Sequence, residues 1–151
     1  HSYSHPGFDG DCWGLTPLSD EGNKQELRKT QELLKKYTGK DNKFFRFPGG
    51  CYSQKDLEDV WKEGMYVVHW DSVGNDGFND DAQNIENNIL SSAQNGSVIV
   101  MHFNGAPNSP KTAYALPTII ATLKQRGFEF VTLSELLGLN QKPRESFNFK
   151  F

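Results

Sequence analysis

The sequence lacks the features that mark a membrane span or a nucleic-acid-binding surface. No apolar run approaches the roughly 20 residues that a helix needs to cross a bilayer. No run of basic residues is present that would follow a phosphate backbone, and the formal net charge of −3 is small for 151 residues. Repeats and low-complexity segments are also absent. We therefore expect one domain over residues 1–151, with a hydrophobic core but with neither a membrane span nor a nucleic-acid partner.

Cysteine is scarce, and the chain contains only Cys12 and Cys51. In an exported protein these two could form one disulfide that fastens two segments together, whereas in a reducing compartment they would stay as thiols. Their spacing does not decide between the two states. Both states remain open from the sequence.

Two histidines, His1 and His5, are separated by three residues. On a single helical turn, this spacing would turn both imidazoles toward one metal ion. The pair is a weak signal by itself, since two surface histidines fall at this spacing by chance in many proteins. Asp9 and Asp11, in the loop that follows, are candidates for a further ligand.

The rest of the chain alternates between helical and strand patterns. The expected helices cover residues 19–38, 54–64, 80–95 and 113–126, and the expected short strands cover residues 43–47, 65–70, 97–102 and 128–132. Residues 7–18 have the Gly- and Asp-rich composition of a loop, and the alternating phenylalanines of residues 140–151 suit a short edge strand. This alternation is typical of a parallel sheet with helical crossovers.

Three further segments follow the histidine pair in a recognisable order. They are Arg46-Phe47-Pro48-Gly49-Gly50, the stretch from Trp70 to Asp76, and an apolar run that ends in His102-Phe103-Asn104-Gly105. Together with the histidine pair, they resemble the second to fifth motifs of the polysaccharide deacetylases, carbohydrate esterase family four. The resemblance covers nearly the whole chain. It implies an α/β fold of the polysaccharide deacetylase type, an incomplete and distorted β/α barrel.

The resemblance also implies roles for five residues. His1 and His5 would be two of three protein ligands of a metal ion. His102 would be the general acid, because imidazole exchanges protons near neutral pH, and Asp76 would fix its tautomer. Arg46 would hydrogen-bond the catalytic base through its two parallel donors. The alternatives are a core histidine at 102, a turn aspartate at 76 and an ordinary surface arginine at 46.

Three aromatic residues are candidates for the substrate-binding groove. The family's aromatic residue after the fourth-motif aspartate is replaced here by Gly77, so that Trp70 or Phe78 would have to form that wall. Phe103 follows His102, where the family often has aspartate. The resemblance therefore implies substrate contacts at Trp70, Phe78 and Phe103.

The first motif of the family has no counterpart in this sequence. Its two aspartates supply the catalytic base and the third metal ligand, whereas Asp80-Asp81 lies in a polar stretch that predicts the capped start of a helix. We expect an N-terminally incomplete domain without its first strand. A preceding segment of the same protein or a second chain would then cover the open sheet edge.

These expectations combine into one predicted function. It is a metal-dependent hydrolase that removes acetyl groups from a polysaccharide of the peptidoglycan, chitin or acetylxylan type, outside the cell or in the cell envelope. The metal would be a divalent ion, with zinc the first choice and cobalt or nickel as alternatives. A catalytically inactive glycan-binding relic without the base, and a purely structural fragment, are the other hypotheses.

Overall fold

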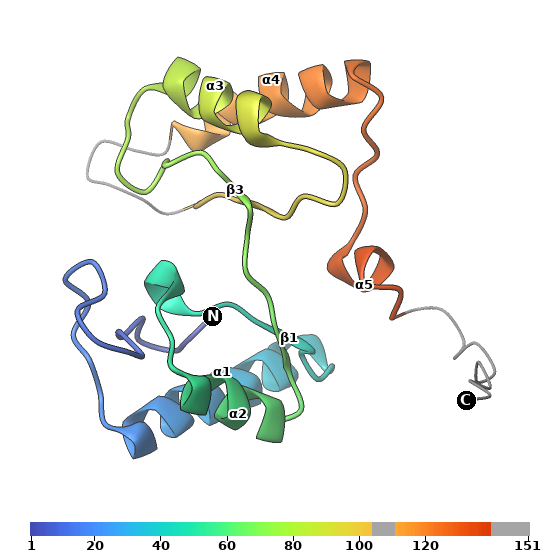
Figure 1. Cartoon of the computed structure of the whole chain (residues 1–151). Helices are drawn as coiled ribbons and strands as arrows, with labels where there is room; N and C mark the ends of the chain where they lie inside the picture. The colour runs from blue at the N-terminus through green and yellow to red at the C-terminus, as the bar shows by residue number, and fades with distance from the viewer. Residues whose placement is uncertain (104–110, 140–151) are drawn as a thin grey trace, which may run out of the picture. The chain divides into compact units, whose positions relative to one another are not determined.

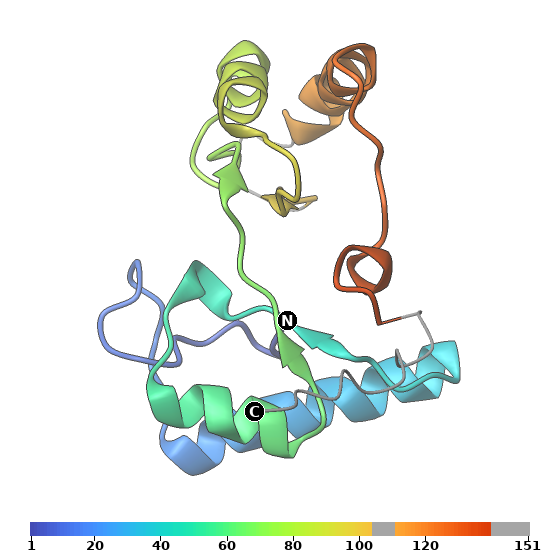
Figure 2. The ribbon, with the colours of Figure 1, turned by 45° about the vertical axis from the view of Figure 1, so that its right-hand side comes forward.

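The computed structural model describes residues 1–103 and 111–139. The chain divides into two compact units, one formed by His1–His69 and the other beginning at Trp70. Each unit combines a pair of parallel strands with packed helices (Figures 1 and 2). The predicted alternation of helices and parallel strands is confirmed within each unit, whereas the single domain over residues 1–151 stays a prediction.

The first unit is built on two helices and a short parallel sheet. Its elements are α1 (Asp20–Thr38), β1 (Phe44–Phe45), the 3-10 turn η1 (Pro48–Gly50), α2 (Gln54–Lys62) and β2 (Tyr66–Val67). Ser19 caps α1 by accepting the backbone N–H of Gly22, as its position before an acidic first turn predicts. Strand β1 pairs with β2 in parallel register. The buried core residues are Phe8, Leu27, Phe45, Phe47, Val60 and Met65.

The second unit places a parallel strand pair beside two helices. Its elements are β3 (Ser72–Val73), α3 (Ala82–Ser92), β4 (Ile99–Val100), α4 (Thr112–Gln125) and α5 (Leu133–Leu136). Asp81 caps α3 through its carboxylate, so the polar Asp80-Asp81 pair starts a helix as expected. Helices α3 and α4 pack against each other, and the buried residues of this core are Ile85, Ile89, Ala115, Ile119 and Leu123.

Several predicted elements differ from the structure. The strands predicted over residues 43–47, 65–70 and 97–102 are present but each is two residues long, and β3 was not predicted. Helix α3 ends at Ser92 rather than near Gly96, because Ala93 already has extended backbone angles. The predicted strand over residues 128–132 is wrong: in the described part of the chain this segment pairs with no strand, and Phe130 and Val131 are exposed. A strand needs a neighbour for its hydrogen bonds, and composition alone does not supply one. The expected edge strand over residues 140–151 lies outside the described residues.

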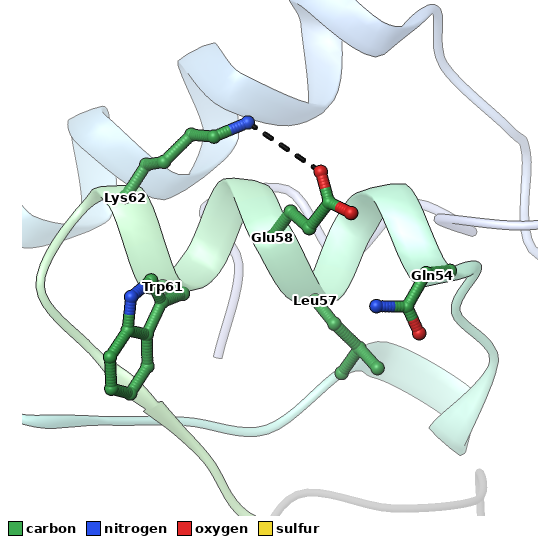
Figure 3. A pocket seen from close by; sticks show the side chains of 5 residues that line it. All are labelled: Gln54, Leu57, Glu58, Trp61 and Lys62. Atoms are coloured by element: carbon green, nitrogen blue, oxygen red, sulfur yellow. Dashed lines mark ion pairs between the residues drawn. The ribbon is translucent and has the colours of Figure 1, made fainter.

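A shallow hollow of about 460 Å³ lies on the exposed face of α2. Its lining residues are Gln54, Leu57, Glu58, Trp61 and Lys62 (Figure 3). None of the predicted site residues lines it. Within residues 1–103 and 111–139, no helix is both long and apolar enough to cross a membrane.

Candidate active site

The second unit brings Asp76 and His102 together at one edge of its strand pair. Asp76 follows β3 and His102 follows β4, and because these strands are parallel, both residues leave the sheet at the carboxyl end. The Asp76 carboxylate is fully buried. It accepts the backbone N–H of His102 at 2.6 Å and lies 2.9 Å from the ring Nδ1 of His102. The predicted partnership of these two residues is therefore present.

Thr112 gives Asp76 a third hydrogen bond that the sequence did not reveal. It is the first residue of α4, and its hydroxyl donates to the Asp76 carboxylate at 2.6 Å. Thr112 is itself buried. The available signal was a hydroxyl residue at the start of a predicted helix, which usually indicates a cap rather than a bond to a distant carboxylate.

The three hydrogen bonds keep Asp76 ionised. Burial alone would raise the pKa of this carboxyl group, but the hydrogen bonds from His102 and Thr112 outweigh burial and hold the pKa below its usual range. An ionised carboxylate can only accept hydrogen bonds, so Nδ1 of His102 carries the proton. In the neutral ring, Nε2 is then the nitrogen without a proton, and it is the one that can exchange a proton with a substrate.

This environment predicts a specific acid sensitivity. A carboxyl group whose pKa is lower in the folded than in the unfolded state stabilises the fold above its unfolded pKa of about 3.9, and this stability is lost as the pH falls through the lower folded value. We expect the melting temperature of the wild type to fall more steeply than that of Asp76→Asn between about pH 4 and pH 2. Thermal unfolding at a series of pH values measures both slopes. Equal slopes would contradict the stabilising role of the Asp76 carboxylate.

Gly77 lies directly against the imidazole of His102. A Cβ atom at this position would be 3.4 Å from Cε1 and 3.5 Å from Nδ1 of the ring. These are ordinary van der Waals distances, so the position that carries the family's aromatic residue borders the imidazole of His102. Of the predicted substrate contacts in this unit, Phe78 is 79% exposed, Phe103 is 96% exposed and Trp70 is half-buried.

The first unit brings His1 and His5 together, but not on a helix. Their ring centroids are 4.8 Å apart in an edge-to-face arrangement. The segment is a bend, and His5 has a φ of 62°, in the left-handed region. The two imidazoles therefore meet across a bend, and not across the helical turn that would also suit their spacing.

Glu26 of α1 holds this bend in place. Its carboxylate accepts the backbone N–H of Ser4 at 2.6 Å and the hydroxyl of Ser4 at 2.8 Å. Glu26 is 22 residues away in the sequence, so no local pattern could have identified this contact. A left-handed residue such as His5 persists only when its surroundings fix it, and Glu26 supplies part of that constraint.

Arg46 contacts His1 through its backbone. The ring Nδ1 of His1 lies 2.6 Å from the carbonyl oxygen of Arg46, which can only accept a hydrogen bond. The Nδ1 nitrogen therefore carries the proton, and Nε2 of His1 is left to bind a metal. The Arg46 side chain is half-buried, and burial lowers the pKa of its guanidinium group.

The donor set of this unit fits two ligands of a metal ion. Neutral imidazoles with an oriented Nδ1–H are common zinc ligands. Among residues 1–103 and 111–139, however, no group of three or more His, Cys, Asp or Glu side chains is arranged to hold an ion. Asp9 and Asp11 therefore do not join His1 and His5 as a third ligand.

The two cysteines form a disulfide. Cys12 of the loop over residues 7–18 is bonded to Cys51, which follows η1, and their Cα atoms are 5.9 Å apart. Of the two states that the sequence left open, the structure contains the bridged one. The disulfide therefore fastens the loop after the histidine pair to the end of η1, the turn that follows Arg46 in the sequence.

Comparison with known proteins agrees with these features. The model of the polysaccharide deacetylase family matches residues 1–68. A peptidoglycan-N-acetylglucosamine deacetylase of Bacillus cereus is 30% identical over 144 residues, which are 95% of this chain and 50% of that protein. A family 4 acetyl xylan esterase from Clostridium thermocellum, solved with a cobalt ion, is 30% identical with a TM-score of 0.79, and the match covers 92% of this chain and 62% of that one.

A third likeness concerns the fold alone. A family pseudoenzyme from Bacillus anthracis is 23% identical with a TM-score of 0.78, over 91% of this chain and 44% of that one. The chain spans about half the length of the Bacillus cereus relative. The predicted fold class, the α/β fold of the polysaccharide deacetylases, is confirmed by the solved structures. This chain belongs to the polysaccharide deacetylase family, carbohydrate esterase family four.

Proposed function

We propose that this chain is part of a metal-dependent hydrolase that removes acetyl groups from a polysaccharide of the peptidoglycan, chitin or acetylxylan type. The observation that carries the proposal is the buried Asp76 carboxylate with its hydrogen bonds to His102. The peptidoglycan deacetylase and the acetyl xylan esterase among the similar proteins support the choice of substrates.

In this proposal His102 is the general acid. Its imidazolium form donates the Nε2 proton to the leaving nitrogen or oxygen of the sugar as the bond to the acetyl carbon breaks. The hydroxyl group of water goes to the released acetate, and the remaining proton of water goes to the catalytic base. Asp76 stabilises the imidazolium and keeps Nδ1–H oriented, as a carboxylate partner does for a catalytic histidine. We assign Trp70, Phe78 and Phe103 to substrate contacts.

We assign the metal ligands to His1 and His5. A bound divalent ion, with zinc as the first choice, would polarise the acetyl carbonyl and lower the pKa of a water molecule. The cobalt ion in the acetyl xylan esterase structure supports a divalent metal in this family. Because no third ligand accompanies the two imidazoles in the described residues, we place that ligand and the base elsewhere in the same protein or on a second chain, with Arg46 as the partner of the base.

The same proposal sets the location. A polysaccharide of the cell wall or of plant material lies outside the cytoplasm, so we place the protein outside the cell or in the cell envelope. The disulfide between Cys12 and Cys51 supports this, since such bonds persist in oxidising compartments.

The second candidate function is a catalytically inactive glycan-binding protein. One observation favours it, namely the lack of a complete three-residue metal site among residues 1–103 and 111–139. Such a protein would bind the polymer without releasing acetate.

Acetate release from three substrates separates these candidates. The purified protein, with any chain that copurifies, would be incubated with zinc and with an acetylated chitin oligomer, peptidoglycan or acetylxylan. Release from at least one polymer supports the hydrolase, and the preferred polymer shows whether the acetyl group is on nitrogen or oxygen. Binding of all three without acetate would establish the second candidate instead.

A further inference from the structure

Trp13 is an exposed aromatic residue in a constrained position. Its side chain is 75% exposed, and its φ of 54° lies in the left-handed region, which a bulky residue adopts only when the surrounding structure enforces it. We propose that Trp13 is a sugar-binding platform that stacks on one ring of a neutral polysaccharide beside the two imidazoles. This proposal rests on the proposed function, since it names a further contact of the same polymer.

One hydrogen bond joins the indole to the turn formed by η1, and a disulfide beside it fastens the loop to the end of the same turn. The indole Nε1–H donates to the carbonyl oxygen of Gly49 at 3.2 Å, and the preceding Cys12 is bonded to Cys51 just beyond that turn. Gly49 has a φ of 62°, and a Cβ atom there would meet the Cys12 sulfur and approach Trp13 Cδ1 to 2.9 Å. The loop is therefore pressed closely onto the turn. Its tryptophan is held at a set position.

The segment just before this turn carries the contact that orients His1. The carbonyl oxygen of Arg46 faces Nδ1 of His1, and Gly49, which holds Trp13, is three residues further along. Three residues span at most about 10–11 Å even when fully extended. The carbonyl group of Gly49, which binds the indole, and the carbonyl group of Arg46, which binds His1, are thus separated by no more than that span. A polymer whose acetyl group lies near His1 and His5 would have neighbouring rings within reach of Trp13.

The chemistry of the loop favours a neutral sugar over an anionic ligand. An indole whose N–H is already bonded to the protein offers a large apolar face, which suits the C–H face of a pyranose. The same loop exposes Asp9 and Asp11, whose carboxylates accept hydrogen bonds from hydroxyl groups and repel phosphates or acidic polymers. The occupant that fits these groups is a polysaccharide with free hydroxyls.

The test compares Trp13 with a second exposed tryptophan. Trp61 on α2 is 68% exposed and lies outside the loop, so Trp61→Ala is the matched control. Binding of a chitin oligomer and of a xylan oligomer would be measured by calorimetry for the wild type, Trp13→Ala, Trp13→Phe and Trp61→Ala. We expect Trp13→Ala to weaken binding of the preferred oligomer about tenfold, the upper end for one aromatic contact. Trp13→Phe should retain most of the affinity, and Trp61→Ala should match the wild type.

Acetate release provides the second readout. With the polymer as substrate, Trp13→Ala should raise KM and leave kcat nearly unchanged. With a small acetate ester, which has no sugar ring to contact Trp13, the substitution should change neither constant. Unchanged oligomer binding in Trp13→Ala, or an equal loss in Trp61→Ala, would overturn the proposal. An equal loss of activity on the small ester would also overturn the proposal. The same holds if thermal unfolding shows that both Trp13 variants have lost the fold of the loop. If oligomer binding depends on Trp13 but no acetate is released, the sugar platform is supported and the hydrolase is rejected. If acetate is released at the same rate and with the same KM in Trp13→Ala, the hydrolase is supported and the sugar platform is rejected.

Discussion

Replacing His102 by alanine is expected to lower kcat for acetate release roughly 100- to 10,000-fold, the usual contribution of a positioned general acid. The reason is geometric, since Asp76 holds Nδ1–H of this ring at 2.9 Å and leaves Nε2 for the leaving group. Oligosaccharide affinity should change little, because the proton transfer is needed only in the transition state. Steady-state kinetics with the preferred acetylated polymer, alongside calorimetric binding, measure both quantities.

His69→Ala is the control for this experiment, because His69 is an exposed histidine whose ring contacts Tyr52. It should retain the wild-type kcat. The assignment of His102 would be wrong if its alanine variant kept more than about a tenth of the wild-type kcat, which is beyond the range expected for a general acid.

Replacing His1 or His5 by alanine is expected to weaken binding of zinc more than about 100-fold, since even the loss of an outer hydrogen-bond partner of a ligand costs about 10- to 100-fold. Acetate release should fall at least about a thousandfold, because the metal contributes several kcal/mol to the reaction. Among residues 1–103 and 111–139, no third His, Cys, Asp or Glu side chain joins the two imidazoles, so neither has a substitute nearby. Competition with a fluorescent chelator measures the affinity.

The two variants should behave alike, and His69→Ala should again match the wild type. Circular dichroism would establish that each variant is folded. If either folded variant bound zinc as tightly as the wild type, His1 and His5 would not be a shared metal site.

Local sequence signals predicted the helices well. Ser19 and Asp81 stand directly before α1 and α3 and cap them with their own side chains, so the cause and the effect lie within a few residues. The wrongly predicted strand over residues 128–132 depends instead on a partner elsewhere in the chain. Its apolar composition carries no information about whether such a partner exists.

The candidate site was predictable where a family motif named its residues. Asp76 and His102 were paired from the resemblance, and the structure joins them by two hydrogen bonds. The bend at His5 and the third bond to Asp76 were not predictable, because Glu26 and Thr112 reach them from 22 and 36 residues away. Contacts of that separation depend on tertiary packing, which spacing within one segment does not encode.

The most direct test of a metal-dependent hydrolase measures metal content and acetate release on one preparation of the purified protein. Metal would be counted by mass spectrometry before chelation, after chelation and after zinc is restored, and acetate release from the preferred polymer would be followed at each stage. We expect about one divalent ion per site, loss of acetate release when the metal is removed, and recovery of acetate release with zinc. Acetate release that persists after the metal is removed, or its absence from the fully loaded protein, would contradict the proposed metal-dependent hydrolase.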